Sequence, residues 1–293
     1  MQLSLKDYKI NEDSLNGIAN SIEETVNKNK DIDFYYIVFP SKTAMLSDLY
    51  PKYIDGNINK DNNEILKQKL GNIKRLNMVN TLDILLNEYS LEERTKYYYH
   101  TDFHWNGKGS FKAFELVINN VEGDKVLKKA KERLRNIEYK DKYFNGDLER
   151  RFSGNIKNTD IPDINKIIGG EDLVYYTSID DAKQVDRKGI IAPSVSKDAV
   201  GYNDIYTYNL SCIRITNKNS ITSKKALVFK DSYFNTMVDS MSTVFNELTI
   251  IDPRYYEEDY SYNKIIKEKD LDYVFFCYHQ NHVDKNLINF LQD

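Results

Sequence analysis

KKALVFKDSYFNTMVDSMSTVFNELTIIDPRYY, residues 224–256, contains two apolar, β-rich runs with a helix-length segment between them. The first run (224–232) predicts a strand, the next segment (233–245) a helix, and the second run (246–256) another strand. A further apolar run, LDYVFFCYHQNH (271–282), predicts the last strand. Strands that alternate with helices of this length favour a parallel sheet with helices on both faces.

The first half of the sequence continues this pattern. FYYIVFP (34–40) is a short, continuous apolar run, as expected of a buried parallel strand, and IKRLNMVN (73–80) is a second strand candidate. Apolar residues at helical spacing predict helices at 13–30, 60–71 and 110–121, and a short helix or turn at 82–89. The sequence therefore predicts an α/β fold with a mostly parallel sheet.

Residues 122–222 depart from this pattern. A charged helix is predicted at 123–137, and polar, turn-rich sequence follows, with strand-like pieces at 173–179 and 205–216. The alternation of apolar and polar residues in these pieces is typical of antiparallel ribbons. We therefore expect one domain over residues 1–293, with a β-rich insertion at about 122–222 packed beside the core.

The charge balance argues against nucleic-acid binding. The 293 residues include 41 Lys and Arg against 45 Asp and Glu, a net charge of −4, whereas a nucleic-acid-binding protein needs a concentrated basic excess. No apolar run reaches the roughly 18 residues that span a bilayer, and MQLSLKDYKINEDS at the start lacks the apolar centre of a signal peptide. The two cysteines, Cys212 and Cys277, are too few for a disulfide scaffold.

Polar side chains follow each predicted strand. They are Ser41 and Lys42, Asp231 and Ser232, Arg254 and Tyr255, and His279 to His282. Because ligands bind at the carboxyl ends of the strands in open parallel sheets, these residues are candidates for one site. YYYHTDFHWNGKGSFKAFE (97–115) adds Asp102 and His104 from a predicted loop before a helix. A hydroxyl, an imidazole and a carboxylate are therefore expected at one edge of the sheet.

Ser232, His104 and Asp102 have the chemistry of a Ser–His–Asp triad. A serine hydroxyl becomes nucleophilic when an imidazole takes its proton, and a carboxylate fixes the tautomer of that imidazole. Ser232 opens a predicted helix directly after a strand, where backbone N–H groups can stabilise an oxyanion. The G-x-S-x-G pattern of the hydrolase nucleophile turn is absent, and a serine in this position is also a common helix cap. Both interpretations of Ser232 stay open at this point.

The stretch 97–115 also permits a metal site. His100 and His104 would share one face of a helix, as in zinc motifs, but Asp102 would then point elsewhere. A third ligand would have to come from afar, such as His279 or His282. In an extended loop, residues two apart share a side, which suits Asp102 as the partner of His104. We therefore expect neither a metal nor a cofactor.

Four other residues are candidate binding groups. Trp105, the single tryptophan, is either a core residue or a platform for a sugar ring. Arg254 and Tyr255 can hold a substrate or an oxyanion, but Arg254 can equally pair with Asp252 or another carboxylate and hold its loop. Lys42 has the same two interpretations. 

The motif TDFHWNGKG (101–109) resembles the TD-x-HW-x-x-x-G signature of the SGNH-hydrolase-like proteins related to the alginate acetylation factors AlgJ and AlgX. The Firmicute branch of these proteins is called the DHHW family. Four further segments resemble family segments in the same order, so that the similarity extends over about residues 34–282. They are FYYIVFPSK (34–42), YFNGDL (143–148), ALVFKDSYF (226–234) and TIIDPRYY (249–256).

This resemblance implies a three-layer α/β/α sandwich of the SGNH-hydrolase type, in which the Asp–His motif precedes the serine. It implies a triad of Ser232, His104 and Asp102 that transfers or hydrolyses O-acetyl groups on a cell-surface or secreted polysaccharide, with the serine carrying the acetyl group. The implied location is extracytoplasmic, at the cell envelope. The implied partners are the polysaccharide and, as the candidate source of acetyl groups, a membrane O-acyltransferase.

One position departs from the family pattern. Lys230 stands where the family usually has glycine, which leaves room and backbone freedom beside the nucleophile. A lysine there can crowd the pocket, point away, or place a cation near the oxyanion. The alternative to an acetyltransferase or acetylesterase is therefore a catalytically degenerate protein of the same fold that binds glycans or assists assembly.

Overall fold

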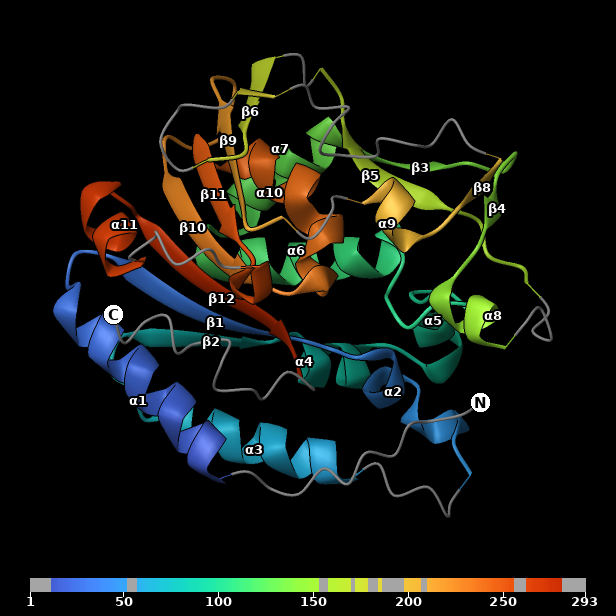
Figure 1. Ribbon diagram of the computed structural model, residues 1–293, viewed down its shortest axis with the longest axis horizontal. Helices are drawn as coiled ribbons and strands as arrows, with labels where there is room; N and C mark the ends of the chain where they lie inside the picture. Colours follow the sequence, from blue (N-terminus) through green and yellow to red (C-terminus); the bar gives the residue numbers. More distant parts are fainter. Residues whose placement is uncertain are drawn as a thin grey trace.

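An eight-stranded sheet forms the centre of the computed structural model, in the order β2-β1-β12-β10-β11-β9-β6-β7 (Figure 1). The structure describes residues 12–51, 57–152, 158–169, 172–178, 184–185, 198–206, 210–255 and 262–280. The strands of the sheet are β1 (Asp33–Phe39), β2 (Leu76–Asn80), β6 (Leu173–Tyr176), β7 (Gln184–Val185), β9 (Cys212–Asn217), β10 (Lys225–Lys230), β11 (Glu247–Ile251) and β12 (Tyr273–His279).

Helices precede or follow most of these strands, as the alternating sequence pattern predicted. The α-helices are α1 (Glu12–Lys28), α2 (Lys42–Met45), α3 (Asn57–Gly71), α4 (Thr81–Glu88), α5 (Leu91–Thr95), α6 (Gly107–Val121), α7 (Asp124–Arg133), α8 (Asp147–Arg151), α9 (Tyr202–Ile205), α10 (Val238–Val244) and α11 (Tyr262–Glu268). Short 3-10 helices are η1 (Ser47–Leu49), η4 (Ser232–Met237) and η5 (Pro253–Tyr255). Among the described residues, no helix combines the length and apolar character that crossing a membrane requires.

The strands predicted from continuous apolar runs form the parallel part of the sheet. β1 pairs in parallel with β2 and β12, and β10 pairs in parallel with β12 and β11. The central strands β1, β10 and β12 are buried on both faces over most of their length, which is why their sequences are continuous apolar runs rather than alternating ones. The prediction of a mostly parallel sheet is confirmed.

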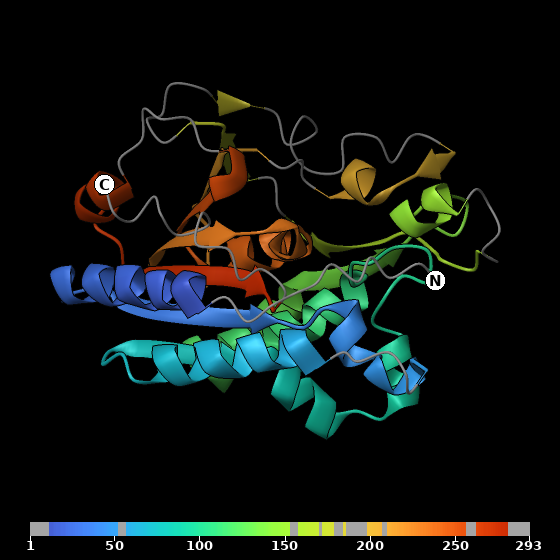
Figure 2. The ribbon, with the colours of Figure 1, turned by 60° about the horizontal axis from the view of Figure 1, so that its bottom comes forward.

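Helices cover both faces of this sheet and enclose two apolar cores. One core lies between the sheet and the helices α1, α3 and α11, and the other between the sheet and α4, α6, α7 and α10. Figures 1 and 2 show α1 and α3 side by side along β1 and β2. The resulting layers, helices–sheet–helices, are those of the predicted α/β/α sandwich.

The segment 122–222 extends the sheet with antiparallel strands, as its alternating sequence predicted. β9 pairs antiparallel with β11, and β6 pairs antiparallel with β9. Two small ribbons lie outside the sheet: β3 (Leu134–Glu138) with β5 (Asp163–Ile167), and β4 (Tyr143–Phe144) with β8 (Ala199–Val200). The description of this segment as an insertion into one domain stays a prediction.

Three predicted elements differ from the structure. The charged helix expected at 123–137 ends at Arg133, and its last residues form β3, which finds a partner in β5. The piece at 205–216 is a strand only from Cys212. The helix expected at 233–245 begins as the 3-10 helix η4 and becomes α-helical at Val238. Residues 281–282 of the last predicted strand, with His282, lie outside the described residues.

Candidate active site

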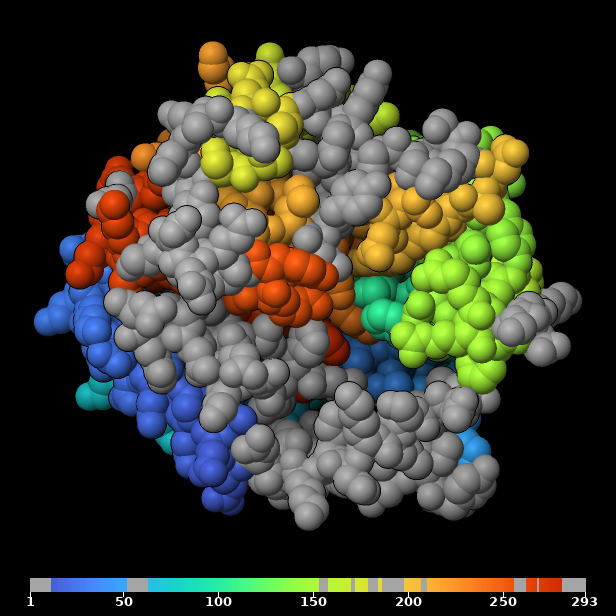
Figure 3. Space-filling view, in the orientation of Figure 1, coloured from blue at the N-terminus to red at the C-terminus, as the bar shows by residue number. Residues whose placement is uncertain are grey.

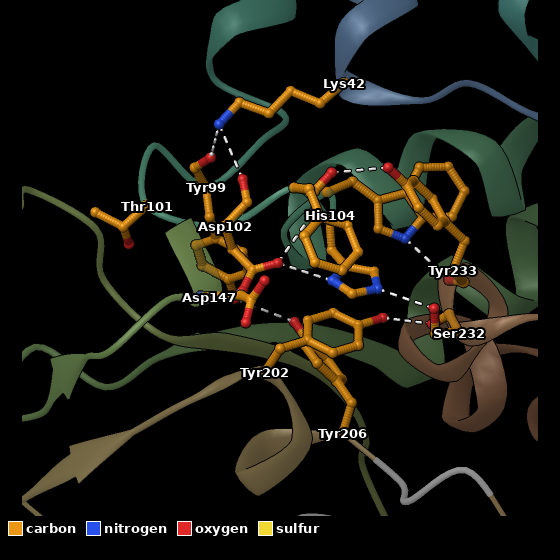
Figure 4. A network of polar contacts seen from close by, with 12 residues as sticks. Lys42, Tyr99, Thr101, Asp102, His104, Asp147, Tyr202, Tyr206, Ser232 and Tyr233 are labelled. Atoms are coloured by element: carbon orange, nitrogen blue, oxygen red, sulfur yellow. Dashed lines mark hydrogen bonds and ion pairs between the residues drawn. The ribbon is translucent and has the colours of Figure 1, made fainter. Parts of the chain in front are cut away.

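Ser232 stands at the turn from β10 into η4. The preceding residue, Asp231, caps this helix, because its carboxylate accepts a hydrogen bond from the Tyr233 amide at 2.9 Å. Ser232 is the first residue of the helix and not its cap, so the cap interpretation of this serine is wrong. Its side chain is instead directed toward His104 (Figure 4).

His104 connects this serine to a carboxylate. Its Nε2 lies 3.0 Å from Ser232 Oγ, and its Nδ1 lies 2.8 Å from Asp102 Oδ1 (Figure 4). An ionised carboxylate only accepts hydrogen bonds, so Nδ1 carries the proton and Nε2 faces the hydroxyl as an acceptor. The structure thus brings together the three residues that the sequence nominated, from segments 128 positions apart.

The Asp102 carboxylate is buried and fully hydrogen-bonded. Besides the His104 ring, Oδ1 accepts the His104 amide at 3.0 Å, and Oδ2 accepts the Asp147 amide at 2.9 Å. Burial alone would raise the pKa of this carboxyl, but the hydrogen bonds from His104 and from the two amides outweigh burial and lower the pKa below its ordinary value of 3.8. Asp102 is therefore ionised at neutral pH and can stabilise an imidazolium.

Aromatic rings fix the plane of the His104 imidazole. The Tyr202 ring stacks on it with centroids 3.7 Å apart and planes 7° apart, and Phe103 and Tyr233 contact it at 4.1 and 5.2 Å. The Tyr202 hydroxyl also donates a hydrogen bond to the Ser232 carbonyl at 2.6 Å. Tyr202 thus touches both the imidazole and the serine backbone. Sequence reasoning missed it, since nothing in the surrounding residues distinguishes it from the other tyrosines.

The segment YFNGDL places α8 against the loop that carries Asp102. Gly146 packs so closely on Thr101 that an added Cβ would lie 2.1 Å from the Thr101 carbonyl oxygen. This approach lets the Leu148 amide donate to the same oxygen at 2.9 Å, beside the bond from the Asp147 amide to Asp102. Glycine is required here for space, because its φ of −69° is ordinary for any residue.

Lys42 does not point into the site as a free cation. Its Nζ donates hydrogen bonds to the carbonyls of Tyr99, His100 and Asp102, at 2.7, 3.0 and 2.9 Å. An ammonium has three donors, so all three are used and none is left for an oxyanion. Of the two sequence interpretations of Lys42, the structural one applies.

Trp105 is a core residue. Its side chain is buried at 1% exposure, packs against Phe39 and Tyr233, and donates from Nε1 to the Tyr233 carbonyl at 3.0 Å. It therefore cannot stack on a sugar, and its candidacy as a binding residue is withdrawn. The exposed ring of this motif belongs to Phe103, which is 41% exposed.

Lys230 and Arg254 share one buried carboxylate. Lys230 Nζ lies 2.9 Å from Asp252 Oδ2 and 2.8 Å from Asn235 Oδ1, and Arg254 makes a two-point contact with Asp252 at 2.6 and 2.8 Å. Burial lowers the pKa of the Lys230 ammonium, although the charge of Asp252 opposes this. Both cations are thus paired with Asp252, and neither acts as an oxyanion group in this arrangement. Tyr255 is exposed and lies under the Arg254 guanidinium, so its side chain stays a candidate for substrate contact.

The metal interpretation finds no support in the part of the chain that the structure describes. No cluster of three potential ligands occurs there. His279 lies beside Asp231 instead, with its Nδ1 and its amide each 2.7 Å from Asp231 Oδ2. The His100 amide donates to Asp160. The contacts of His279 tie the end of β12 to the turn that carries Ser232.

The site opens onto one face of the molecule. Figure 3 shows a hollow there, with green atoms of the chain near residue 100 at its floor, between the yellow-green atoms of α8 and the gold atoms around α9. The hydroxyl, the imidazole and the ionised carboxylate form a hydrogen-bonded series. In such a series the imidazole can take the proton of the hydroxyl and later give it to a departing group, while the carboxylate stabilises the charged ring. That is the arrangement required for acyl transfer through a serine.

Comparison with known proteins establishes the fold. No protein-family model and no curated protein matches the sequence. Among solved structures, PatB1 from Bacillus cereus with a sulfonyl adduct superposes with a TM-score of 0.80 at 22% identity, covering 97% of this chain and 93% of that chain. A DHHW family protein from Eubacterium siraeum gives 0.71 at 18% identity, with 96% and 88% covered. The O-acetyltransferase domain of Pseudomonas putida AlgJ gives 0.52 at 10% identity, with 96% and 90% covered.

These similarities confirm the fold class expected from the sequence, a three-layer α/β fold with a mostly parallel sheet. The chain shares this fold with a DHHW family protein and with a domain of AlgJ. Both belong to the groups of proteins that the sequence motifs resemble.

Proposed function

We propose that this protein is a serine-dependent O-acetyltransferase or acetylesterase that acts on a polysaccharide through an acetyl-Ser232 intermediate. The observation that carries the proposal is the contact between His104 Nε2 and Ser232 Oγ at 3.0 Å, with Asp102 on the other ring nitrogen. The acetyl group is suggested by the fold, which is shared with a protein domain known as an O-acetyltransferase.

In the first step, Ser232 Oγ attacks the acetyl carbonyl of a donor ester while His104 Nε2 takes the hydroxyl proton. Asp102 stabilises the imidazolium. When the tetrahedral intermediate collapses, the ester bond breaks and the departing alcohol receives the proton from His104. In the second step, a sugar hydroxyl or water gives its proton to His104 and attacks the carbonyl carbon of acetyl-Ser232. The bond between Ser232 Oγ and the acyl carbon then breaks, His104 returns the proton to Oγ, and the acetylated sugar or acetate leaves. The sugar acceptor makes a transferase, and water makes an esterase.

The Ser232 N–H is the donor that we assign to the oxyanion. The first N–H groups of a helix have no partner within the helix, and Ser232 is the first residue of η4. The next amide, that of Tyr233, is already bonded to Asp231. Lys42 and Lys230 are bonded elsewhere and do not contribute.

The binding-only alternative loses its main support. It rested on Lys230 crowding the nucleophile or altering the oxyanion site. The Lys230 side chain is buried at 1% exposure and its ammonium is paired with Asp252 and Asn235. The lysine thus fills a space inside the fold, and the contact between Ser232 and His104 forms in its presence.

The polysaccharide and the location also belong to this proposal. We place the substrate at the cell surface or in secreted material and the protein outside the cytoplasm, on the sequence resemblance to alginate acetylation proteins. A membrane O-acyltransferase is the partner we expect to supply acetyl groups.

Turnover of p-nitrophenyl acetate by wild type, Ser232→Ala and Ser47→Ala tests the proposal. Ser47 opens the exposed 3-10 helix η1 as Ser232 opens η4, so it is a matched control. We expect Ser232→Ala to lower kcat at least about 10³-fold and Ser47→Ala to have no effect, because the nucleophile is lost only in the first. Equal turnover by all three proteins would remove Ser232 as the nucleophile. Acetyl release and transfer over a panel of acetylated and bare polysaccharides then separates esterase from transferase.

A further inference from the structure

The loop Tyr99–His104 is held from one side by a cation. Lys42, at the start of α2, donates hydrogen bonds to the carbonyls of Tyr99, His100 and Asp102 within 3.0 Å. Figure 4 shows the bonds to Tyr99 and Asp102. Three donors of one ammonium therefore meet three carbonyl dipoles of a single loop. Such charge-assisted bonds are stronger than neutral ones.

The same loop is held through its amides by an anion. Asp160 Oδ1 accepts the His100 amide at 2.7 Å, and Asp160 Oδ2 accepts the Thr101 amide at 2.7 Å and the Thr101 hydroxyl at 2.6 Å. The Lys42 ammonium thus faces carbonyl oxygens of the loop, and the Asp160 carboxylate faces its amide N–H groups. The two charges come from segments far apart in the sequence, and each has the sign that its side of the loop requires.

We propose that Lys42 and Asp160 form an ionic clamp on the loop Tyr99–His104, and that this clamp positions the Asp102–His104 pair relative to Ser232. The inference rests on the proposed function, because its consequence is a rate. Neither residue touches the reacting atoms, so both are positioning residues. A relay of hydrogen bonds tolerates little displacement, and an error of about 1 Å in a catalytic group can cost about 10²-fold in rate.

The clamp makes activity sensitive to alkaline pH. Burial lowers the pKa of Lys42 from 10.5 to about 8, against the attraction of Asp160 and Asp102, the charged groups that face it. The Tyr233 hydroxyl, which interacts with the Lys42 backbone, keeps its proton because burial raises its pKa. A neutral amine has two donors for three carbonyls, and it carries no charge. We therefore expect kcat to fall as pH rises through about 8.

Stability should change in the opposite direction. The folded protein releases the Lys42 proton near pH 8, whereas the unfolded chain keeps it to about 10.5. Between these values the unfolded state binds more protons, so this group makes the folded state more stable as pH rises. If activity were lost because the protein unfolds, stability would fall together with kcat as pH rises. The combination of falling kcat with undiminished stability is specific to a positioning role.

The experiment compares kcat and KM for p-nitrophenyl acetate in wild type, Lys42→Arg, Lys42→Met and Asp160→Asn, from about pH 6 to 10. Ser232→Ala serves as the blank, and Lys74→Met, at an exposed lysine, is the control for loss of a surface charge. Thermal melting of each protein at each pH reports folding.

We expect Lys42→Met to lower kcat about 10²-fold at pH 7 with KM within about 2-fold, and Asp160→Asn to act in the same sense. Lys42→Arg should retain activity, and its kcat should not fall above about pH 8, because a guanidinium stays charged over this range. If Lys42→Met does not fold, the wild-type and Lys42→Arg pH profiles decide. The same fall of kcat at alkaline pH in wild type and Lys42→Arg, or full kcat in a folded Lys42→Met, would overturn the clamp. An active Ser232→Ala would instead overturn the proposed function on which the clamp depends.

Discussion

Replacing Gly146 by alanine tests whether α8 supports the site through close backbone contact. An alanine Cβ would lie 2.1 Å from the Thr101 carbonyl oxygen and 2.4 Å from its carbon, and both are backbone atoms that cannot rotate away. Because real Cβ atoms stay beyond 3.0 Å, the two segments must separate by roughly 1 Å. This movement would carry the first turn of α8 away from the loop of Asp102.

The separation breaks two hydrogen bonds that are each 2.9 Å long. One runs from the Leu148 amide to the Thr101 carbonyl, and the other from the Asp147 amide to the Asp102 carboxylate. A further 1 Å leaves both beyond hydrogen-bond length. The neutral bond is worth about 1 kcal/mol and the bond to the carboxylate about 2 kcal/mol, so we expect a loss of about 3 kcal/mol in the free energy of unfolding. The displaced carboxylate should also lower kcat about 10²-fold.

Urea unfolding and p-nitrophenyl acetate kinetics measure the two effects. Gly71→Ala is the matched control, since an added Cβ there meets nothing within 4 Å. We expect Gly71→Ala to keep wild-type kcat and to lose no stability. A Gly146→Ala protein within about 0.5 kcal/mol of wild type and with full kcat would refute the reasoning.

Three further changes test other parts of the structure. Asp252→Asn should lower the free energy of unfolding by about 3–5 kcal/mol, because it leaves the buried Lys230 ammonium without a carboxylate; Lys230→Met should cost much less, because Asp252 keeps Arg254. Urea unfolding of both variants measures this, and a larger loss in Lys230→Met would contradict it. The pKa of Asp102 in the folded state lies below its ordinary value of 3.8. The ionised carboxylate therefore stabilises the folded state fully above pH 3.8, and this contribution is lost as the pH falls through the folded-state pKa. Wild type should thus lose more stability than Asp102→Asn below about pH 4. Equal acid sensitivity of the two proteins would be the opposite result. Trp105→Phe should lower the free energy of unfolding by about 1–3 kcal/mol, because it leaves a gap in the core and removes the indole hydrogen bond to the Tyr233 carbonyl, which keeps only the bond from the Thr236 hydroxyl. KM for the polysaccharide should be unchanged; a raised KM with unchanged stability would reinstate the sugar-stacking role.

The central strands were predictable because their burial leaves a direct record in the sequence. β1, β10 and β12 are apolar except at their ends, since both faces of a central parallel strand are covered. The start of the helix after β10 was not predictable from periodicity. There the Asp231 side chain caps a 3-10 turn, and hydrophobic spacing does not distinguish such a turn from an α-helix.

The contact between the three residues of the proposed triad was also predictable, but the residues that support them were not. Ser232 and the Asp102–His104 pair follow from the rule on strand ends together with the motif around Trp105. Tyr202 and Asp160 act through contacts with loops far away in the sequence, and neither has a local pattern.

Charged residues near the strand ends were ambiguous for a related reason. Lys42, Arg254 and Lys230 have side chains that suit either a substrate or a structural partner. Only the fold shows that their partners are three carbonyls and the Asp252 carboxylate. Residue type gives the chemistry that is available, and tertiary contacts decide where it is used.

The activation of Ser232 by His104 is tested most directly by labelling the serine with phenylmethylsulfonyl fluoride and locating the adduct by peptide mass spectrometry. We predict one sulfonyl group, on Ser232, and labelling that is slower by about 10²–10⁴-fold in His104→Ala, because the general base is gone. An adduct on another residue, or equal labelling rates in the two proteins, would contradict the account.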